Sequence, residues 1–254
     1  MLLKNCLELS KQNKLNVIFI LLVNFLFAPN LNPENLSKYL LNYPNLDDPD
    51  GEVVFNNNYA VLQRLVVGPG EWEGVHSHPG NQIYVHIKGG YWSGRMHGEL
   101  DYEKEFSPDG SVGWMGAIPI ADCHDSGNSG DTPIELIYVT LKQDASEEEG
   151  DDTELQTYPY VDLELLFDNH RFFAQKVILN PREWEGAHLQ NGRRISIVIK
   201  GGSISSKRNG EYFFREREIS PGDVEWLEPK SPNETFERGN EGEETIEYVL
   251  VTIK

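Results

Sequence analysis

The chain has 254 residues, of which 39% are hydrophobic, which fits one large or two small globular domains. Its formal net charge of −19 argues against a nucleic-acid-binding protein, because neutralising phosphates requires a basic face. The same charge disfavours anionic membrane surfaces. We therefore expect no nucleic acid among its partners, and no membrane once any signal segment is removed.

The first 28 residues differ in character from the rest of the chain. Lys4, Lys11 and Lys14 precede an apolar run from Leu15 to Ala28. This run has the length of a signal peptide's hydrophobic part and is too short to span a bilayer comfortably. Residues 1–28 are interpreted as a signal peptide or an unstructured leader. A signal peptide would make the protein periplasmic or secreted; without one it would be cytoplasmic.

The remainder of the chain repeats itself with a constant spacing of 112 residues. The segment Glu71-Trp72-Glu73-Gly74 recurs as Glu183-Trp184-Glu185-Gly186, and Ile87-Lys88-Gly89-Gly90 recurs as Ile199-Lys200-Gly201-Gly202. At this spacing residues 55–142 align with residues 167–254 without a gap. Such self-similarity indicates two copies of one structural unit.

Each copy consists of short β-rich runs separated by Gly, Pro and Asn turns. Ala60–Val67 and Gln82–Gly89 are examples from the first copy, and Arg194–Gly201 is one from the second. This pattern is typical of antiparallel sandwiches or barrels. Residues 143–157 are acidic and lack apolar periodicity, so they are predicted to form a linker between domains at residues 29–142 and 158–254.

Potential metal ligands gather in the first copy. His76 and His78 are two residues apart, so they share a face if the local structure is a strand. Pro79-Gly80 then predicts a turn or bend, after which Gln82 opens a β-rich run. His124 lies further on, in the segment Gly113–Asn128.

This arrangement resembles the cupin superfamily. The first cupin motif, G…HxH…E…G, is matched by Gly70, His76, His78 and Gly89, with Gln82 in the place of the glutamate. The second motif, G…P…H…N, is matched by Gly113, Pro119, His124 and Asn128. The resemblance covers nearly all of residues 43–254. It implies an all-β protein of two tandem cupin barrels (double-stranded β-helices, or jelly rolls) with a few short helices, that is, a bicupin.

The resemblance also implies a single divalent metal ion in the N-terminal cupin, bound by His76, His78, His124 and Gln82. Gln82 either ligates the ion through its amide oxygen or occupies a supporting position. Fe2+ is the favoured ion, with Mn2+, Ni2+, Co2+, Zn2+ and Cu2+ as alternatives. Cupins often form dimers, so the resemblance also allows a homodimer.

Comparing the two copies distinguishes residues that serve the fold, which both copies share, from candidates for function, which occur in one copy only. Features of both copies, including the EWEG segments and their tryptophans, are interpreted as packing residues. The four ligand positions are occupied in the second copy by His188, Gln190, Arg194 and Phe236. One imidazole beside a fixed positive charge does not hold a divalent ion, so this metal site is predicted to be lost. Arg193 and Arg194 are interpreted as solvated or ion-paired, with anion binding as the alternative.

The donor set suggests a class of substrate. Three neutral imidazoles and a neutral amide leave a divalent ion its full charge, which favours substrates that bind as anions. Open coordination suits O2 activation at iron, enolisation or hydrolysis. Tyr84 and His86, on the same face as Gln82, either line the pocket or fill an ordinary barrel interior.

From the resemblance we expect a metal-dependent enzyme acting on a small anionic molecule. A dioxygenase is favoured over an isomerase or lyase, because three-histidine cupins include iron dioxygenases. The alternative is a non-catalytic bicupin that only binds a metal or a small molecule. The fold by itself does not choose between these functions.

Overall fold

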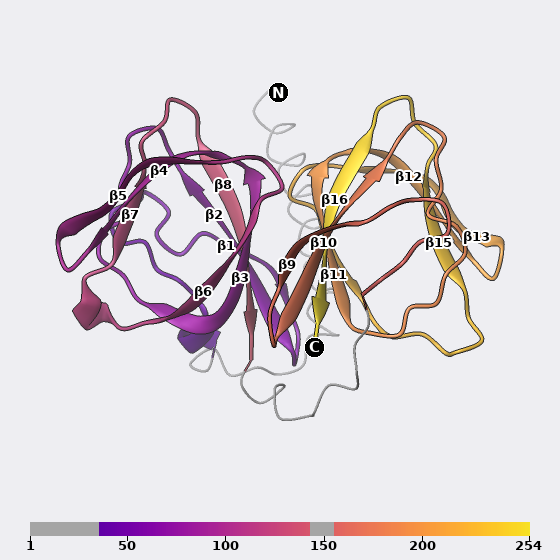
Figure 1. Ribbon diagram of the computed structural model, residues 1–254, viewed down its shortest axis with the longest axis horizontal. Helices are drawn as coiled ribbons and strands as arrows, with labels where there is room; N and C mark the ends of the chain where they lie inside the picture. The colour runs from indigo at the N-terminus through magenta and orange to yellow at the C-terminus, as the bar shows by residue number, and fades with distance from the viewer. Residues whose placement is uncertain (1–35, 143–154) are drawn as a thin grey trace, which may run out of the picture. The chain divides into compact units, whose positions relative to one another are not determined.

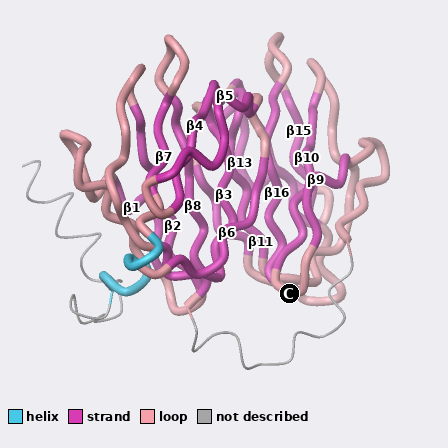
Figure 2. Tube along the Cα trace, turned by 60° about the vertical axis from the view of Figure 1, so that its left-hand side comes forward, coloured by secondary structure: helices cyan, strands magenta, loops and turns pink. Residues whose placement is uncertain are grey.

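The computed structural model describes residues 36–142 and 155–254 (Figure 1). Residues 1–28 and most of the expected linker at 143–157 lie outside the described residues. Strands dominate the described chain, and the helices are the short 3-10 segments η1 (Ser37–Tyr39) and η2 (Ile120–Asp122) (Figure 2). None of the described helices is long and apolar enough to cross a membrane. The expectation of an all-β protein with a few short helices is confirmed.

The first barrel contains eight strands in two antiparallel sheets. They are β1 (Glu52–Asn56), β2 (Ala60–Val67), β3 (His78–Lys88), β4 (Gly90–Met96), β5 (Glu99–Ser107), β6 (Val112–Ile118), β7 (Asp125–Asn128) and β8 (Ile134–Leu141). The order is β1-β2-β8-β3-β6 in the larger sheet and β5-β4-β7 in the smaller one. The chain thus crosses between the two sheets, from β3 to β4, from β5 to β6, from β6 to β7 and from β7 to β8, as in a jelly roll.

The second barrel repeats this plan. Its strands are β9 (Glu164–Asp168), β10 (Phe172–Leu179), β11 (Arg194–Lys200), β12 (Gly202–Arg208), β13 (Glu211–Ile219), β14 (Val224–Leu227), β15 (Phe236–Asn240) and β16 (Ile246–Ile253). The sheet orders β14-β11-β16-β10-β9 and β13-β12-β15 correspond strand for strand to those of the first barrel. Strands β2 and β10 begin at Ala60 and Phe172, so the 112-residue spacing of the sequence recurs in the structure.

Strand β3 is buried on both faces, and its alternation assigns each side chain to one of two environments. Ile83, Val85 and Ile87 belong to an apolar cluster that also contains Ile195 and Ile197 of the second barrel. Burying each such side chain stabilises the fold by about 1.5–3 kcal/mol. The intervening residues of β3 therefore point into the first barrel, as the period of two requires.

Tryptophans of both copies serve packing, as expected. Trp114 lies 5.9 Å from Phe172 and Trp226 lies 5.5 Å from Phe55 between ring centroids, so both contribute to the contact between the five-stranded sheets. Trp72 forms an isolated bridge with Gly127. A Cβ on Gly127 would lie 2.8 Å from the indole ring, which explains a glycine opposite this tryptophan.

Candidate metal centre

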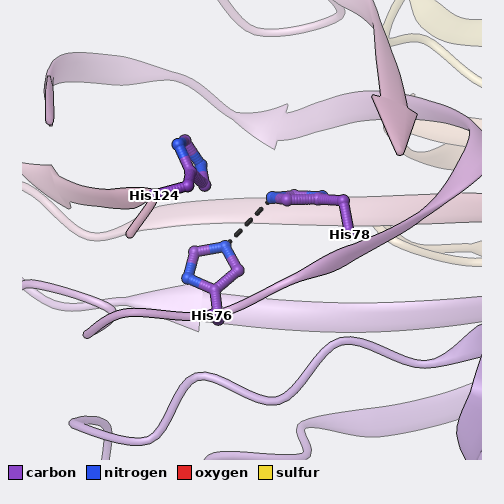
Figure 3. Close-up of side chains that lie close together, drawn as sticks. All are labelled: His76, His78 and His124. Atoms are coloured by element: carbon purple, nitrogen blue, oxygen red, sulfur yellow. Dashed lines mark hydrogen bonds between the residues drawn. The ribbon is translucent and has the colours of Figure 1, made fainter. Parts of the chain in front are cut away.

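Three histidines from two segments meet inside the first barrel (Figure 3). His76 precedes β3, His78 is its first residue, and His124 lies between η2 and β7. The backbone N–H of His76 donates to the carbonyl of His124 at 3.1 Å, which joins the two segments. All three side chains are buried, and their candidate ligand nitrogens lie within 4.8 Å of one another. The structure thus brings together the three histidines predicted from the sequence.

A bulge in β3 positions His78 relative to Gln82. The register with β6 shifts between Pro79 and Gln82, where Gly80 has a φ of 79°. The turn or bend predicted at Pro79-Gly80 is therefore a bulge within a continuous strand, because pairing with β6 continues on both sides. A Cβ on Gly80 would lie 2.9 Å from the Ala117 nitrogen, so glycine permits this close approach.

Hydrogen bonds fix which nitrogen of two histidines faces the centre. His76 Nδ1 lies 2.8 Å from the Gly74 carbonyl oxygen, which can only accept, so Nδ1 carries the proton. His78 Nδ1 lies 3.1 Å from Gln82 Oε1, while Gln82 Nε2 donates to Thr140 Oγ1 at 2.8 Å. In the neutral rings both Nε2 atoms are therefore unprotonated. These two atoms face each other at 3.0 Å.

Two nitrogen lone pairs at this distance repel each other unless a positive charge lies between them. Burial lowers the pKa of His76 to about 4 and that of His78 to about 3, so neither ring is protonated at neutral pH. Two nitrogens bound at right angles to one ion at about 2.1 Å would lie about 3 Å apart. The donor set therefore fits a metal ion of the kinds that accept imidazole, such as iron, zinc, copper or nickel.

Gln82 is fully buried and in contact with His78. Its amide oxygen accepts from the ring and its amide nitrogen is held by Thr140, an arrangement that orients a ligating histidine. This contact favours the supporting role over direct ligation. That Gln82 itself binds the ion stays a prediction.

Glu73 is the site residue that sequence reasoning missed, because its EWEG segment occurs in both copies and was interpreted as a packing segment. Its side chain is 1% exposed, and Oε2 lies 3.7 Å from His76 Nε2. Ser126 Oγ donates to Oε2, whereas Oε1 has no hydrogen-bond partner among the described residues. Burial raises the pKa of Glu73 to about 8. The Glu73 carboxyl group thus lies beside His76 and has one oxygen without a hydrogen bond among the described residues, and the charge of a metal ion would favour its ionised form.

The equivalent glutamate of the second barrel, Glu185, has a cationic partner that Glu73 lacks within the described chain. Glu185 is paired with Arg238, whose Nε lies 3.0 Å from Glu185 Oε1. Arg238 occupies the position of Ser126, and Tyr248 donates a further hydrogen bond to the same carboxylate oxygen. Glu185 therefore has a structural ion pair, whereas Glu73 has no arginine or lysine partner among the described residues.

The second barrel does not assemble a metal set. Among the residues that the structure describes, the three histidines of the first barrel are the only group suited to a metal. His188 retains its contact with the Gly186 carbonyl at 2.9 Å, but it faces the ring of Phe236. Gln190 donates to the Glu228 carbonyl at 2.7 Å. That the second barrel has lost its metal site stays a prediction.

A cavity of about 240 Å³ adjoins the histidines of the first barrel. Its lining includes His124, Tyr84 and His86, so the two predicted pocket residues do face a pocket. His86 is held at both ring nitrogens: Trp92 Nε1 donates to Nε2 at 2.9 Å, and Ser111 Oγ lies 2.9 Å from Nδ1. Because burial also lowers its pKa to about 4, His86 is a fixed neutral wall of the cavity.

Comparison with known proteins supports the fold. No family model and no curated protein matches the chain. Among solved structures, AerE from Microcystis aeruginosa superposes with a TM-score of 0.54 at 10% identity, covering 85% of this chain and 99% of that one. Oxalate decarboxylase from Lactobacillus farciminis, as a formate complex, gives 0.52 at 12% identity and covers 77% of each chain.

The 11S allergen from Cocos nucifera gives a TM-score of 0.50 at 13% identity, covering 77% of this chain and 80% of that one. Together with the strand order of the two barrels, these three likenesses show that the chain has the fold predicted from the sequence, two tandem cupin barrels. Because an enzyme and an allergen share this architecture at such low identity, the likeness does not define an activity.

Proposed function

We propose that the first barrel is the active site of a mononuclear metal-dependent enzyme that acts on a small anionic molecule. One observation carries the proposal: two buried imidazoles direct unprotonated Nε2 atoms at each other at 3.0 Å, with their Nδ1 protons held by Gly74 and Gln82. Without a bound cation this arrangement is repulsive. His124 supplies the third nitrogen donor.

The charge of the proposed centre differs from that of a purely neutral donor set. Glu73 lies close enough to His76 to contribute a carboxylate. A divalent ion bound by three imidazoles and one carboxylate keeps one net positive charge, which still attracts an anionic substrate. Glu105 adds a negative charge at the cavity, so the attraction for an anion comes from the ion itself.

The cavity favours a small substrate with both polar and apolar parts. At about 240 Å³ it has room for a molecule of modest size beside the histidines. Trp92, Met115 and Leu136 provide apolar walls. The Tyr84 hydroxyl has no hydrogen-bond partner within the described part of the chain and can donate to a carboxylate or enolate oxygen.

The chemistry expected of such a centre follows from its donors. A bound ion would supply Lewis acidity and, if it is Fe2+, a site for O2. The chain's residues would orient the substrate through Tyr84, exclude water with the apolar walls and hold a proton or the ion at Glu73 Oε1. We favour a dioxygenase first and an isomerase or lyase second.

The test is elemental analysis of full-length protein purified anaerobically, followed by O2-uptake assays with small carboxylic acids, keto acids and catechols. We expect one metal ion per chain and substrate-dependent O2 consumption that a chelator abolishes. Turnover without O2 consumption would select the isomerase or lyase. Stoichiometric metal and tight binding of a small acid without turnover would instead support the non-catalytic alternative.

A further inference from the structure

The second barrel contains a buried cation at the position of Gln82. Arg194 is the first residue of β11 and is 4% exposed. It is neither solvated nor ion-paired among the described residues, which corrects the interpretation made from the sequence. Its neighbour Arg193 does follow that interpretation: it lies 3.8 Å from Glu228 and donates to the Tyr59 hydroxyl at 2.7 Å.

Unsatisfied polar atoms gather around Arg194. Its Nε and Nη1 atoms are buried and have no hydrogen-bond partner within the described chain. Thr252 is its cross-strand partner on β16, so the two side chains share a face, and Thr252 Oγ1 is also buried without a partner. Buried donors and buried charges normally have partners, so these three atoms indicate a ligand site.

The remaining charges of this interior do not neutralise Arg194. Glu185 is taken by Arg238 at 3.0 Å and by the hydroxyl of Tyr248. Burial lowers the pKa of His188, so this ring stays neutral and adds no charge. Arg238 is thus compensated by Glu185 and, at 3.9 Å, by Glu225, whereas Arg194 pairs with no carboxylate among the described residues.

Space for a small molecule lies along the same strand. A cavity of about 270 Å³ is lined by Ser196, which is two residues from Arg194 on β11 and therefore on the same face. Arg217 and Arg238 also line this cavity, together with Glu218, Asp223 and Glu225, but Arg217 pairs with Glu225 and Arg238 with Glu185. Arg194 is therefore the buried arginine of this interior that has no carboxylate partner among the described residues.

We propose that the second barrel binds a small carboxylate, with Arg194 as its cation and Thr252 as a hydrogen-bond donor. A planar guanidinium matches the two oxygens of a carboxylate, and its weak hydration suits a buried site. The proposal is independent of the metal in the first barrel, because it rests on a different set of residues. It assigns the second barrel a binding role in place of its lost metal site.

Arg194→Gln tests this site, because it installs the residue that the first barrel carries there. Acetate binding to full-length holoprotein would be followed by calorimetry and by the dependence of Tm on acetate at constant ionic strength. We expect wild type to show an acetate site that Arg194→Gln weakens at least about tenfold, since a charge-assisted hydrogen bond is lost. Arg193→Gln removes a neighbouring charge outside this site and should retain the response.

Two readouts keep the result interpretable. Metal content should be equal in all three proteins, so that acetate bound at the metal contributes equally. In a buffer without small carboxylates, Arg194→Gln should unfold at the same or a higher temperature than wild type, because an unpaired buried charge is gone.

An unchanged acetate response in Arg194→Gln would overturn the proposal. A lowered Tm of this variant without carboxylate would also overturn it, because it would reveal that Arg194 has a structural partner. A response equally strong with chloride would show a simple halide site instead.

Discussion

The two barrels share one arrangement of strands but bury different ionisable groups. In the first, the Glu73 carboxyl group lies 3.7 Å from His76 Nε2 with no arginine or lysine beside it among the described residues. In the second, Arg238 pairs with the equivalent Glu185 at 3.0 Å, and Arg194 is a further buried cation. One interior therefore suits a bound cation and the other a bound anion.

This difference shows how one scaffold supports two kinds of site. All the exchanged residues except the exposed Glu105 and Arg217 are buried in the barrels, whereas strand pairing is made by backbone groups that every residue supplies. The exchanges, written first barrel then second, are His78 to Gln190, Gln82 to Arg194, Glu105 to Arg217, His124 to Phe236 and Ser126 to Arg238. Inward side chains can thus be replaced while the strands retain their register.

The largest expected effect comes from giving the first barrel the aromatic residue of the second. His124→Phe copies Phe236 and leaves two imidazoles, too few to retain an ion firmly. We expect the metal content to fall from one ion per chain to almost none, measured by elemental analysis after anaerobic purification. The matched control is His188→Phe, which should leave the metal content unchanged. A His124→Phe protein that retains a full complement of metal would contradict the three-histidine centre.

Ser126→Arg transfers the ion pair of the second barrel to the first. The new guanidinium should pair with Glu73 as Arg238 pairs with Glu185, and its charge should oppose a metal ion nearby. Two unit charges 4 Å apart interact by about 4 kcal/mol at an effective dielectric of 20, so metal affinity should fall at least about a hundredfold. Chelator competition would measure it, with circular dichroism to verify folding. Equal losses in Ser126→Ala would show that charge is not responsible.

Glu73→Gln removes the charge while keeping the shape of the side chain. Metal affinity should fall about tenfold to a hundredfold, because a carboxylate beside the ion is lost. The metal-free protein should be at least as stable as wild type at neutral pH, since burial raises the pKa of Glu73 to about 8 and the cost of this raised pKa disappears with glutamine. The matched change Glu185→Gln should spare metal binding but destabilise the fold by about 3–5 kcal/mol, because Arg238 loses its partner. Identical behaviour of the two variants would mean that both glutamates are purely structural.

Two substitutions of Gln82 distinguish its effect on the orientation of His78 from the effect of charge at this position. Gln82→Ala should lower metal affinity about tenfold, because His78 loses the acceptor that orients its ring. Gln82→Glu retains an acceptor and adds a negative charge, so it should bind the metal at least as tightly and small carboxylates more weakly. Both quantities would be measured at matched metal occupancy. If Gln82→Glu binds such anions as well as wild type, the charge argument fails.

The smallest effect is expected at the cavity wall. Tyr84→Phe removes a hydroxyl but leaves the ring and the metal ligands in place. Binding of a small carboxylate to the metal-loaded protein should weaken roughly fivefold, the effect of one hydrogen bond, with the metal content unchanged. The second barrel offers Ser196 at this position, and Ser196→Ala is the control. An unchanged affinity in Tyr84→Phe would place the substrate elsewhere in the cavity.

Much of this architecture follows directly from the sequence. The 112-residue repeat indicated two equivalent units, and the strands recur at that spacing because apolar and turn residues recur with it. The two-residue spacing of Gln82, Tyr84 and His86 placed them on one face of a strand, since side chains alternate. The three histidines were found because they are few and match the motifs of the cupin superfamily.

The role of the glutamates was decided only by the tertiary structure. Glu73 and Glu185 lie in identical EWEG tetrapeptides on equivalent backbone, so local sequence cannot distinguish them. What separates them is the side chain across the barrel, Ser126 or Arg238, which in each case comes 53 residues later. From the sequence, Arg194 is likewise interpreted as a solvated or ion-paired arginine. It is buried because β11 lies between β14 and β16. Charge pairing and burial depend on neighbours distant in sequence, and folding brings them together.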